Sequence, residues 1–427
     1  MNQRALIIGL DGVPFRLMDD LSQQGVMPYF NQLKETGTFT RMASSIPEVS
    51  SVSWSSIITG KNPGEHSIYG FTELLPSSYT VSFPTFNKLK ATPFWQNQGE
   101  FCIINVPSTY PASPLNGVLV SGFISPDMER AVYPRTFLEV LTKFNYKIDV
   151  DTKKARKYPL VLFRELFEAL ESRVAFSHYL WERVKWDVFM LVFTGSDRLG
   201  HFLWDAYENE SHPYHKEFLQ FFSRIDEALR DFGENLNPED ALIILSDHGM
   251  EQTQYNLNVN CVLEEAGFLR RGKDPRKGYN NIQEDSKAFA LDPGRIYINK
   301  KGKYPRGCVE PGEERGVLSK LHHTLESLEI NGQKAITHIY ENPQIYHGPH
   351  TGLGPDLVLM PARGINLKGG ILTETPLDKD ILPGKHTQED AFLFVRGDCT
   401  VNANPTVEDV VPLLTEWLGW CNESSQC

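Results

Sequence analysis

Short apolar runs, each closed by a polar residue or a glycine, constrain this chain more than any other feature of its sequence. Runs of this length are typical of buried strands. Stretches with helical spacing of apolar residues lie between several of them. The strand candidates are 5–10, 101–106, 188–193, 241–245, 357–360 and 391–395, and the helix candidates are 163–174, 218–232 and 406–418.

Strands that alternate with helices favour a mainly parallel sheet covered by helices on both faces. We therefore expect an α/β fold with three layers, α/β/α. The 427 residues are enough for one large catalytic domain, 1–427, with an insertion. The segment from about 256 to 344 is rich in charge, glycine and proline, which predicts an inserted cap subdomain there, and the stretch 72–94 is a second, smaller candidate.

The charge balance limits the partners of the chain. Its net charge of −12 argues against a nucleic-acid polymer, because phosphate backbones are bound by an excess of Lys and Arg. An acidic protein still binds an anionic substrate when metal ions supply local positive charge. No apolar run approaches the ~20 residues of a membrane span, and no signal-peptide pattern precedes Asp11. We expect no membrane partner, and the oligomeric state stays open.

Cysteine usage favours a reducing compartment. The six cysteines are scattered and none forms a Cys-x-x-Cys motif, so neither a metal knuckle nor a disulfide framework is indicated. We expect free thiols and a cytoplasmic location. The residues are Cys102, Cys261, Cys308, Cys399, Cys421 and Cys427.

Acidic residues and histidines stand at the ends of three predicted strands. Asp11 follows the first strand, Asp197 follows the strand 188–193, and the pair Asp247 and His248 follows the next one. Parallel sheets bind ligands at the carboxyl ends of their strands. Carboxylate and imidazole groups are ligands for divalent metals. Their placement indicates a metal-dependent site at this edge of the sheet.

Each of these residues has an ordinary interpretation when taken alone. Asp11 fits a helix cap, and Asp197 with His201 fits a surface pair four residues apart on a helix. His386 fits a loop histidine, and the serine-rich stretch 47–56 fits a solvated turn or an anion-binding helix start. Their common order and placement favour a shared site instead.

These segments resemble the alkaline phosphatase superfamily, and within it the type I phosphodiesterase/nucleotide pyrophosphatase branch, in particular its bacterial and archaeal phosphohydrolase- or phosphomutase-like members. The resemblance spans almost the whole chain. It is carried by residues 8–12, 27–33, 59–66, 105–111, 197–201, 246–250, 296–299, 355–358, 386 and 409–412.

The resemblance implies two divalent metal ions, zinc in the first place, with manganese or iron as alternatives. It implies Ser50 as the catalytic nucleophile, at a helix start where both a cation and the helix dipole favour its ionised form. One metal would be held by Asp11, Ser50, Asp247 and His248, and the other by Asp197, His201 and His386.

Two departures from the family pattern leave alternatives open. Val52 stands where the family usually has proline two residues after the nucleophile, so Ser51 remains an alternative to Ser50. Phe71 stands where nucleotide pyrophosphatases have an asparagine that binds a phosphoryl oxygen. Asn105, at the end of another predicted strand, is a candidate for that phosphoryl-binding role.

The function implied is a two-metal-dependent phosphohydrolase that cleaves small-molecule phosphate esters, phosphodiester or nucleotide-type, through a phosphoserine intermediate. Within the superfamily, a phosphomonoesterase or a phosphomutase/phosphotransferase is the alternative. Outside it, a degenerate metal-free binding protein is disfavoured because all six protein ligands are retained. The identity of the substrate does not follow from the sequence.

Overall fold

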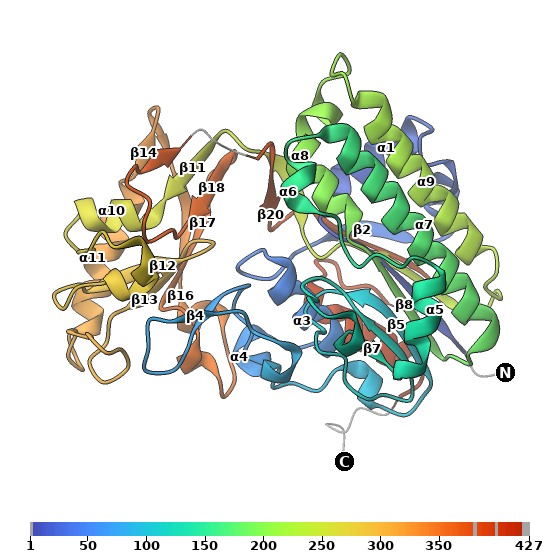
Figure 1. Ribbon diagram of the computed structural model, residues 1–427, viewed down its shortest axis with the longest axis horizontal. Coiled ribbons are helices and arrows are strands. Elements are labelled where there is room, and N and C mark those ends of the chain that lie inside the picture. Colours follow the sequence, from blue (N-terminus) through green and yellow to red (C-terminus); the bar gives the residue numbers. More distant parts are fainter. Residues whose placement is uncertain (1–2, 379–381, 398–399, 421–427) are drawn as a thin grey trace. The chain divides into compact units, whose positions relative to one another are not determined.

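The computed structural model describes residues 3–378, 382–397 and 400–420 (Figure 1). The chain forms two compact units, and the assignment of one catalytic domain to 1–427 stays a prediction. The predicted insertion, about 256–344, lies within the second unit, and its action as a cap stays a prediction. Unit 1 comprises 1–61, 85–250 and 386–427, and unit 2 comprises 62–84 and 251–385.

Unit 1 is built on an eight-stranded sheet in the order β2-β21-β9-β1-β8-β5-β6-β7. The five strands from β9 to β6 are parallel, whereas β21 and β7 pair antiparallel with their neighbours. The mainly parallel sheet predicted from the sequence is therefore confirmed. Its strands are β1 (Ala5–Leu10), β2 (Thr38–Met42), β5 (Phe101–Val106), β6 (Gly117–Ser121), β7 (Val132–Tyr133), β8 (Val188–Phe193), β9 (Ala241–Leu245) and β21 (Ala391–Arg396).

Both faces of this sheet are covered, because successive side chains of a strand point to opposite sides. In β1, Leu6 and Ile8 join the apolar core that includes side chains of α1, α7, α8 and α9. Ala5 and Ile7 join the core on the other face, with α3 and α13. Three layers result, as expected. The helices of unit 1 are α1 (Phe15–Gln23), α2 (Pro28–Leu33), α3 (Ser50–Thr59), α5 (Leu138–Lys143), α6 (Thr152–Ala155), α7 (Pro159–Arg183), α8 (Gly195–Glu208), α9 (His215–Gly233) and α13 (Val410–Trp417).

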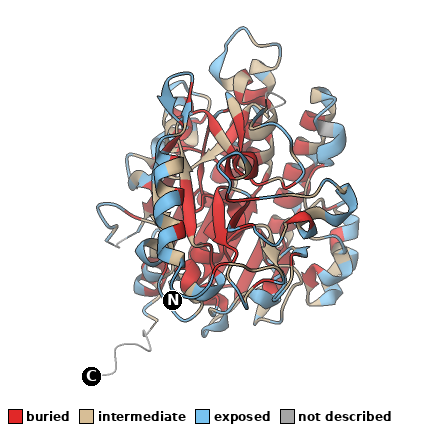
Figure 2. Ribbon diagram, turned by 90° about the vertical axis from the view of Figure 1, so that its left-hand side faces the viewer, coloured by how far each residue is buried: buried red, intermediate tan, exposed pale blue. Residues whose placement is uncertain are grey.

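The three predicted helices are present, but their first and last residues differ from those predicted. The segments 163–174 and 218–232 lie inside α7 and α9. The last one begins with a short 3₁₀ turn, Val407–Asp409, where Thr406 and Asp409 form a reciprocal cap before α13. Figure 2 shows buried residues along the strands and exposed residues on the outward sides of the helices. No helix in the described part of the chain is both long and apolar enough to cross a membrane.

Unit 2 has its own apolar core and its own sheets. The strand predicted at 357–360 belongs here: β17 pairs antiparallel with β13 and β16, not with the central sheet. An apolar run reveals burial but not its pairing partner, which is why the sequence could not assign it. The elements of unit 2 include β3 (Glu73–Leu74), β4 (Val81–Ser82), β11 (Tyr255–Asn258), β12 (Ala288–Leu291), β13 (Arg295–Ile298), β14 (Glu329–Ile330), β15 (Gln333–Lys334), β16 (Ile336–Glu341), β17 (Leu357–Pro361), β18 (Ile365–Lys368), β19 (Leu377–Asp378), α4 (Pro63–His66), α10 (Val259–Glu265), α11 (Glu314–Glu326) and α12 (Asn342–Ile345).

Two further strands, β10 (Gly249–Gln252) and β20 (Gly384–Thr387), lie where the chain passes between the units. Cys102, Cys261 and Cys308 are free thiols, as predicted. The other three cysteines lie outside the described residues.

The central strand gives a stability prediction. Ile8 is fully buried in β1, so Ile8→Ala should lower the free energy of unfolding by about 2–5 kcal/mol through lost burial and a cavity. All seven tryptophans lie in unit 1, so denaturant unfolding followed by tryptophan fluorescence reports on this unit.

The matched control is Leu160→Ala in α7, where Leu160 is 66% exposed. It should change the free energy of unfolding by no more than about 0.5 kcal/mol. Equal effects of the two substitutions would contradict the assignment of β1 to the core.

Candidate metal centre

Three neighbouring parallel strands place the acidic residues at one edge of the central sheet. Asp11 directly follows β1, Asp197 lies in the first turn of α8 after β8, and Asp247 follows β9. In the sheet, β1 lies between β9 and β8. Because parallel strands end on the same side, the three carboxylates converge there.

The remaining predicted site residues reach the same edge from other elements. His201 lies one turn after Asp197 in α8, His248 follows Asp247, and His386 is in β20. Ser50 is the first residue of α3, after an extended Val49 with φ −132° and ψ 140°. The hydroxyl therefore stands at a helix N-terminus, where the helix dipole favours negative charge.

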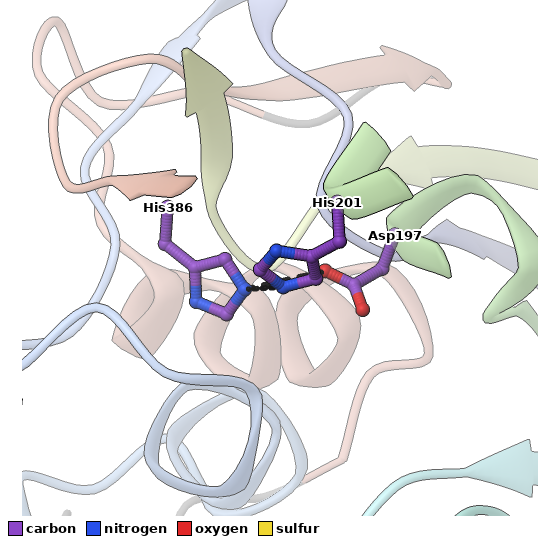
Figure 3. A group of neighbouring side chains, drawn as sticks. All are labelled: Asp197, His201 and His386. Carbon is purple, nitrogen blue, oxygen red and sulfur yellow. Dashed lines mark hydrogen bonds and ion pairs between the residues drawn. The ribbon is translucent and has the colours of Figure 1, made fainter. Parts of the chain in front are cut away.

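The first group of ligands consists of Asp197, His201 and His386 (Figure 3). Asp197 Oδ1 is 3.3 Å from His201 Nε2 and 3.2 Å from His386 Nε2. The two Nε2 atoms are 2.8 Å apart. The side chains of His201 and His386 are 22% and 14% exposed, so this group is less buried than the second one.

The second group consists of Asp11, Asp247 and His248, all fully buried. His248 Nε2 is 3.3 Å from Asp247 Oδ2 and 3.7 Å from Asp11 Oδ1. The imidazole rings of His248 and His386 stack with their centroids 3.6 Å apart, which joins the two groups. The six predicted metal ligands thus lie in two adjacent groups.

Ser50 contacts the second group. Its Oγ is 3.1 Å from His248 Nε2 and 3.4 Å from Asp11 Oδ1. The hydroxyl of Ser51 is buried and has no hydrogen-bond partner among the described residues. The structure brings Ser50, and not Ser51, into hydrogen-bonding contact with predicted ligands.

Each of the three carboxylates has one oxygen held by a protein donor. Trp54 Nε1 donates to Asp11 Oδ2 at 3.0 Å, and the Gly12 amide donates to Asp247 Oδ1 at 3.0 Å. The guanidinium of Arg198 donates to the Oδ2 of Asp197 at 3.2 Å. The other oxygen of each carboxylate faces a histidine Nε2 of its group.

The donor set fits divalent cations. Asp247 Oδ2 is buried and has no hydrogen-bond donor among the described residues, a costly arrangement unless a cation compensates it. His386 Nδ1 donates to the Glu48 carbonyl at 2.9 Å, and His248 Nδ1 donates to the Gly249 carbonyl at 3.0 Å. These bonds leave both Nε2 lone pairs directed at the site, as in histidines that bind metal.

Burial shapes the acidity of the ligands. It raises the pKa of Asp11, with the charges of Asp247 and Asp197 adding to the shift, and it also raises the pKa of Asp247. Burial lowers the pKa of His248 to about 4, so its imidazole is neutral at pH 7. At Asp197 burial opposes ionisation, but His201, His386 and Arg198 outweigh it and lower the pKa.

The turn after Asp11 requires glycine. Gly12 has φ +69°, a conformation that other residues rarely adopt. A Cβ there would stand 3.0 Å from Asp197 Oδ1. The absence of a side chain lets Asp197 approach the turn that carries Asp11.

Asn105 is buried and is hydrogen-bonded to Val192, Thr194 and Tyr146. Its amide nitrogen donates to the Val192 carbonyl at 3.4 Å and to Thr194 Oγ1 at 3.3 Å, and its amide oxygen accepts from Tyr146. The predicted role of Asn105 in phosphoryl binding stays a prediction.

Three anchoring groups were not predicted from the sequence: the Trp54 indole, the Gly12 amide and the Arg198 guanidinium. Trp54 is close to Ser50 in the chain and Gly12 is next to Asp11, so the sequence gave a weak indication that both lie near the site. Asp149 accepts hydrogen bonds from Arg198 but lies 49 residues away in the chain, so the sequence did not indicate this contact.

The fold and the site together define a three-layer α/β protein with two adjacent groups of carboxylate and imidazole ligands and a serine hydroxyl against one of them. The family model for type I phosphodiesterase / nucleotide pyrophosphatase matches residues 5–387. The chain belongs to this family.

Solved structures of low sequence identity share the fold. Phosphonoacetate hydrolase from Sinorhizobium meliloti 1021, in complex with phosphonoacetate, aligns over 98% of this chain and 95% of its own, with 17% identity and a TM-score of 0.69. Murine ectonucleotide pyrophosphatase / phosphodiesterase 5 aligns over the same shares with 14% identity and a TM-score of 0.57. The human protein of that name aligns over 98% of this chain and 95% of its own, with 13% identity and a TM-score of 0.58. No curated protein sequence matches the chain.

The buried acids predict that zinc stabilises the protein more at high pH. Because the pKa values of Asp11 and Asp247 are raised above 3.8 by folding, the metal-free protein loses stability as pH rises through the raised values. Zinc bound by these carboxylates would replace those protons, at about 1.4 kcal/mol per pH unit for each proton displaced. The shift in melting temperature between zinc and chelator should be larger at pH 8 than at pH 5.5.

Scanning calorimetry at the two pH values measures this shift. In Asp247→Asn the dependence on pH should shrink, because one of the two titrating carboxylates is gone. A zinc-induced shift of the wild type that is equal at both pH values would contradict the account.

Proposed function

We propose that this protein is a two-metal-dependent phosphohydrolase that cleaves phosphate esters, preferably phosphodiester or nucleotide-type, through a phosphoserine intermediate on Ser50. Membership of the type I phosphodiesterase / nucleotide pyrophosphatase family supports the class of reaction. The observation that carries the assignment is the position of Ser50 Oγ, 3.1 Å from His248 Nε2 and 3.4 Å from Asp11 Oδ1 at a helix start.

In the proposed site Asp11, Asp247, His248 and Ser50 would hold one divalent ion, and Asp197, His201 and His386 would hold the other. The ions, proposed to be zinc with manganese or iron as alternatives, would supply positive charge that favours ionisation of the serine hydroxyl and neutralises the phosphoryl oxygens. Asp and His ligands suit these metals.

In the proposed reaction, Ser50 Oγ forms a bond to phosphorus while the bond to the ester oxygen opposite breaks. The leaving alcohol or phosphate departs with the bonding electrons, and the serine proton is released. In the second step a water oxygen bonds to phosphorus and the Ser50–phosphorus bond breaks, which restores the serine. The N-terminus of α3 favours the negative charge on Oγ.

The structural neighbours are consistent with a small phosphoryl ligand. The Sinorhizobium enzyme binds phosphonoacetate, and a variant of the murine protein described as inactive binds AMP. By analogy we propose a small-molecule phosphate ester as the partner of this chain, in a cytoplasmic setting that the free thiols suit.

The test combines metal analysis with hydrolysis of bis-para-nitrophenyl phosphate and para-nitrophenyl phosphate. The wild type should bind about two metal ions per chain and cleave the diester. Ser50→Ala should lower kcat by at least about a thousand-fold, because the nucleophile is lost. Ser51→Ala is the matched control and should keep kcat within about threefold, since its hydroxyl touches no predicted ligand.

Other outcomes change the assignment. Bound metal with cleavage of the monoester alone would favour a phosphomonoesterase or phosphomutase. Loss of activity in Ser51→Ala but not in Ser50→Ala would move the nucleophile to Ser51. A protein without metal and without activity on either ester would contradict an enzymatic function.

The covalent intermediate gives a separate prediction. When the wild type is quenched in acid during turnover, mass spectrometry should find one phosphoryl group on the peptide that contains Ser50. The same peptide from Ser50→Ala should carry none. Turnover without a phosphorylated peptide, even when the quench is fast relative to kcat, would favour direct attack by water.

A further inference from the structure

The guanidinium of Arg198 lies between a metal-ligand carboxylate and a second carboxylate. Nη1 donates to Asp197 Oδ2 at 3.2 Å. Nε and Nη2 donate to the carboxylate of Asp149, at 3.1 Å and 2.7 Å. Arg198 therefore links Asp149 to Asp197 through three of its nitrogens.

This guanidinium has little freedom to move. Its side chain is 15% exposed, and it lies over the ring of Phe123 with 4.5 Å between the guanidinium carbon and the ring centroid. A planar fork held by two carboxylates and an aromatic face keeps one orientation. Asp197 Oδ2 is consequently fixed, and only Oδ1 is left to face His201 and His386.

Arg198 differs in kind from the anchors of the other two carboxylates. Asp11 is held by an indole and Asp247 by a backbone amide, which are neutral donors. The Asp197 carboxylate accepts a hydrogen bond from a cation. Among the described residues, the buried Asp11 and Asp247 carboxylates accept from neutral anchors and from no cationic side chain. The two groups therefore present different charges to a metal.

We propose that Arg198, held by Asp149, is a positioning residue that presents Asp197 to the metal as a ligand through one oxygen. The proposal rests on the two-metal function proposed above. Hydrogen bonds that orient a metal ligand typically contribute about 10–100-fold in metal affinity. Loss of the Arg198 fork would let the Asp197 carboxylate rotate and weaken zinc binding at its group.

The test measures zinc affinity without substrate, by titration calorimetry against a competing chelator. An Asp247→Asn background weakens the other group, so that the Asp197 group can be followed. In this background Arg198→Met should raise the zinc Kd about 10–100-fold. Asp149→Asn should raise it in the same direction, and Arg198→Lys, which keeps the charge but not the fork, should fall between Arg198→Met and the parent.

Arg164→Met is the control, because Arg164 is an exposed arginine of α7 with a side chain 64% exposed. It should leave the zinc Kd within about twofold. The cobalt(II) absorption spectrum is a second measurement, since it reports ligand geometry, and it should change in Arg198→Met but not in Arg164→Met.

The outcomes separate this proposal from the proposed function. Arg198 also lines a cavity of about 680 Å³ beside Phe123, so it could instead bind substrate there. If substrate binding were its only role, its substitution would leave the zinc Kd unchanged. The positioning role alone is overturned if the wild type binds two zinc ions and the zinc Kd is unchanged or lower in Arg198→Met and Asp149→Asn. A wild type that binds none of zinc, manganese and iron overturns both. If Arg198→Met fails to fold, the Kd values of Arg198→Lys and Asp149→Asn decide.

Discussion

The rest of the site depends on the convergence of three buried carboxylates at one edge of the central sheet. Asp11, Asp197 and Asp247 are each less than 4% exposed, and their charges repel one another. Folding by itself leaves Asp11 and Asp247 with raised pKa values, a state that costs free energy at neutral pH. Divalent cations bound by these carboxylates would remove this cost.

In each carboxylate, one oxygen accepts a hydrogen bond from a neighbouring residue and the other oxygen faces the site. Trp54 anchors Asp11, the Gly12 amide anchors Asp247, and Arg198 anchors Asp197. His248 and His386 are oriented by backbone carbonyls in the same way. A site arranged in this manner is preorganised, because little rotation of the ligands is needed when charge develops on a phosphoryl group.

The sequence placed Asp11, Asp197 and the pair Asp247 and His248 after strands, and they lie together because the ends of neighbouring parallel strands are close in space. The assignment of His201, His386 and Ser50 to the same site came from the family resemblance. Ser50 was harder to assign, since Val52 departs from the family pattern, and its contacts with His248 distinguish it from Ser51. The sequence could not predict which strands pair with 357–360 or that Asp149 binds Arg198, because both depend on contacts between distant segments. Local pattern does not encode such contacts.

The most direct test of the central claim is the anomalous diffraction of zinc in crystals of the protein soaked with that metal. The account predicts two peaks per chain, roughly 3.5–4 Å apart, one at Asp197, His201 and His386 and the other at Asp11, Asp247 and His248 beside Ser50. A single peak, or peaks bound by other residues, would contradict a two-metal centre built from these ligands.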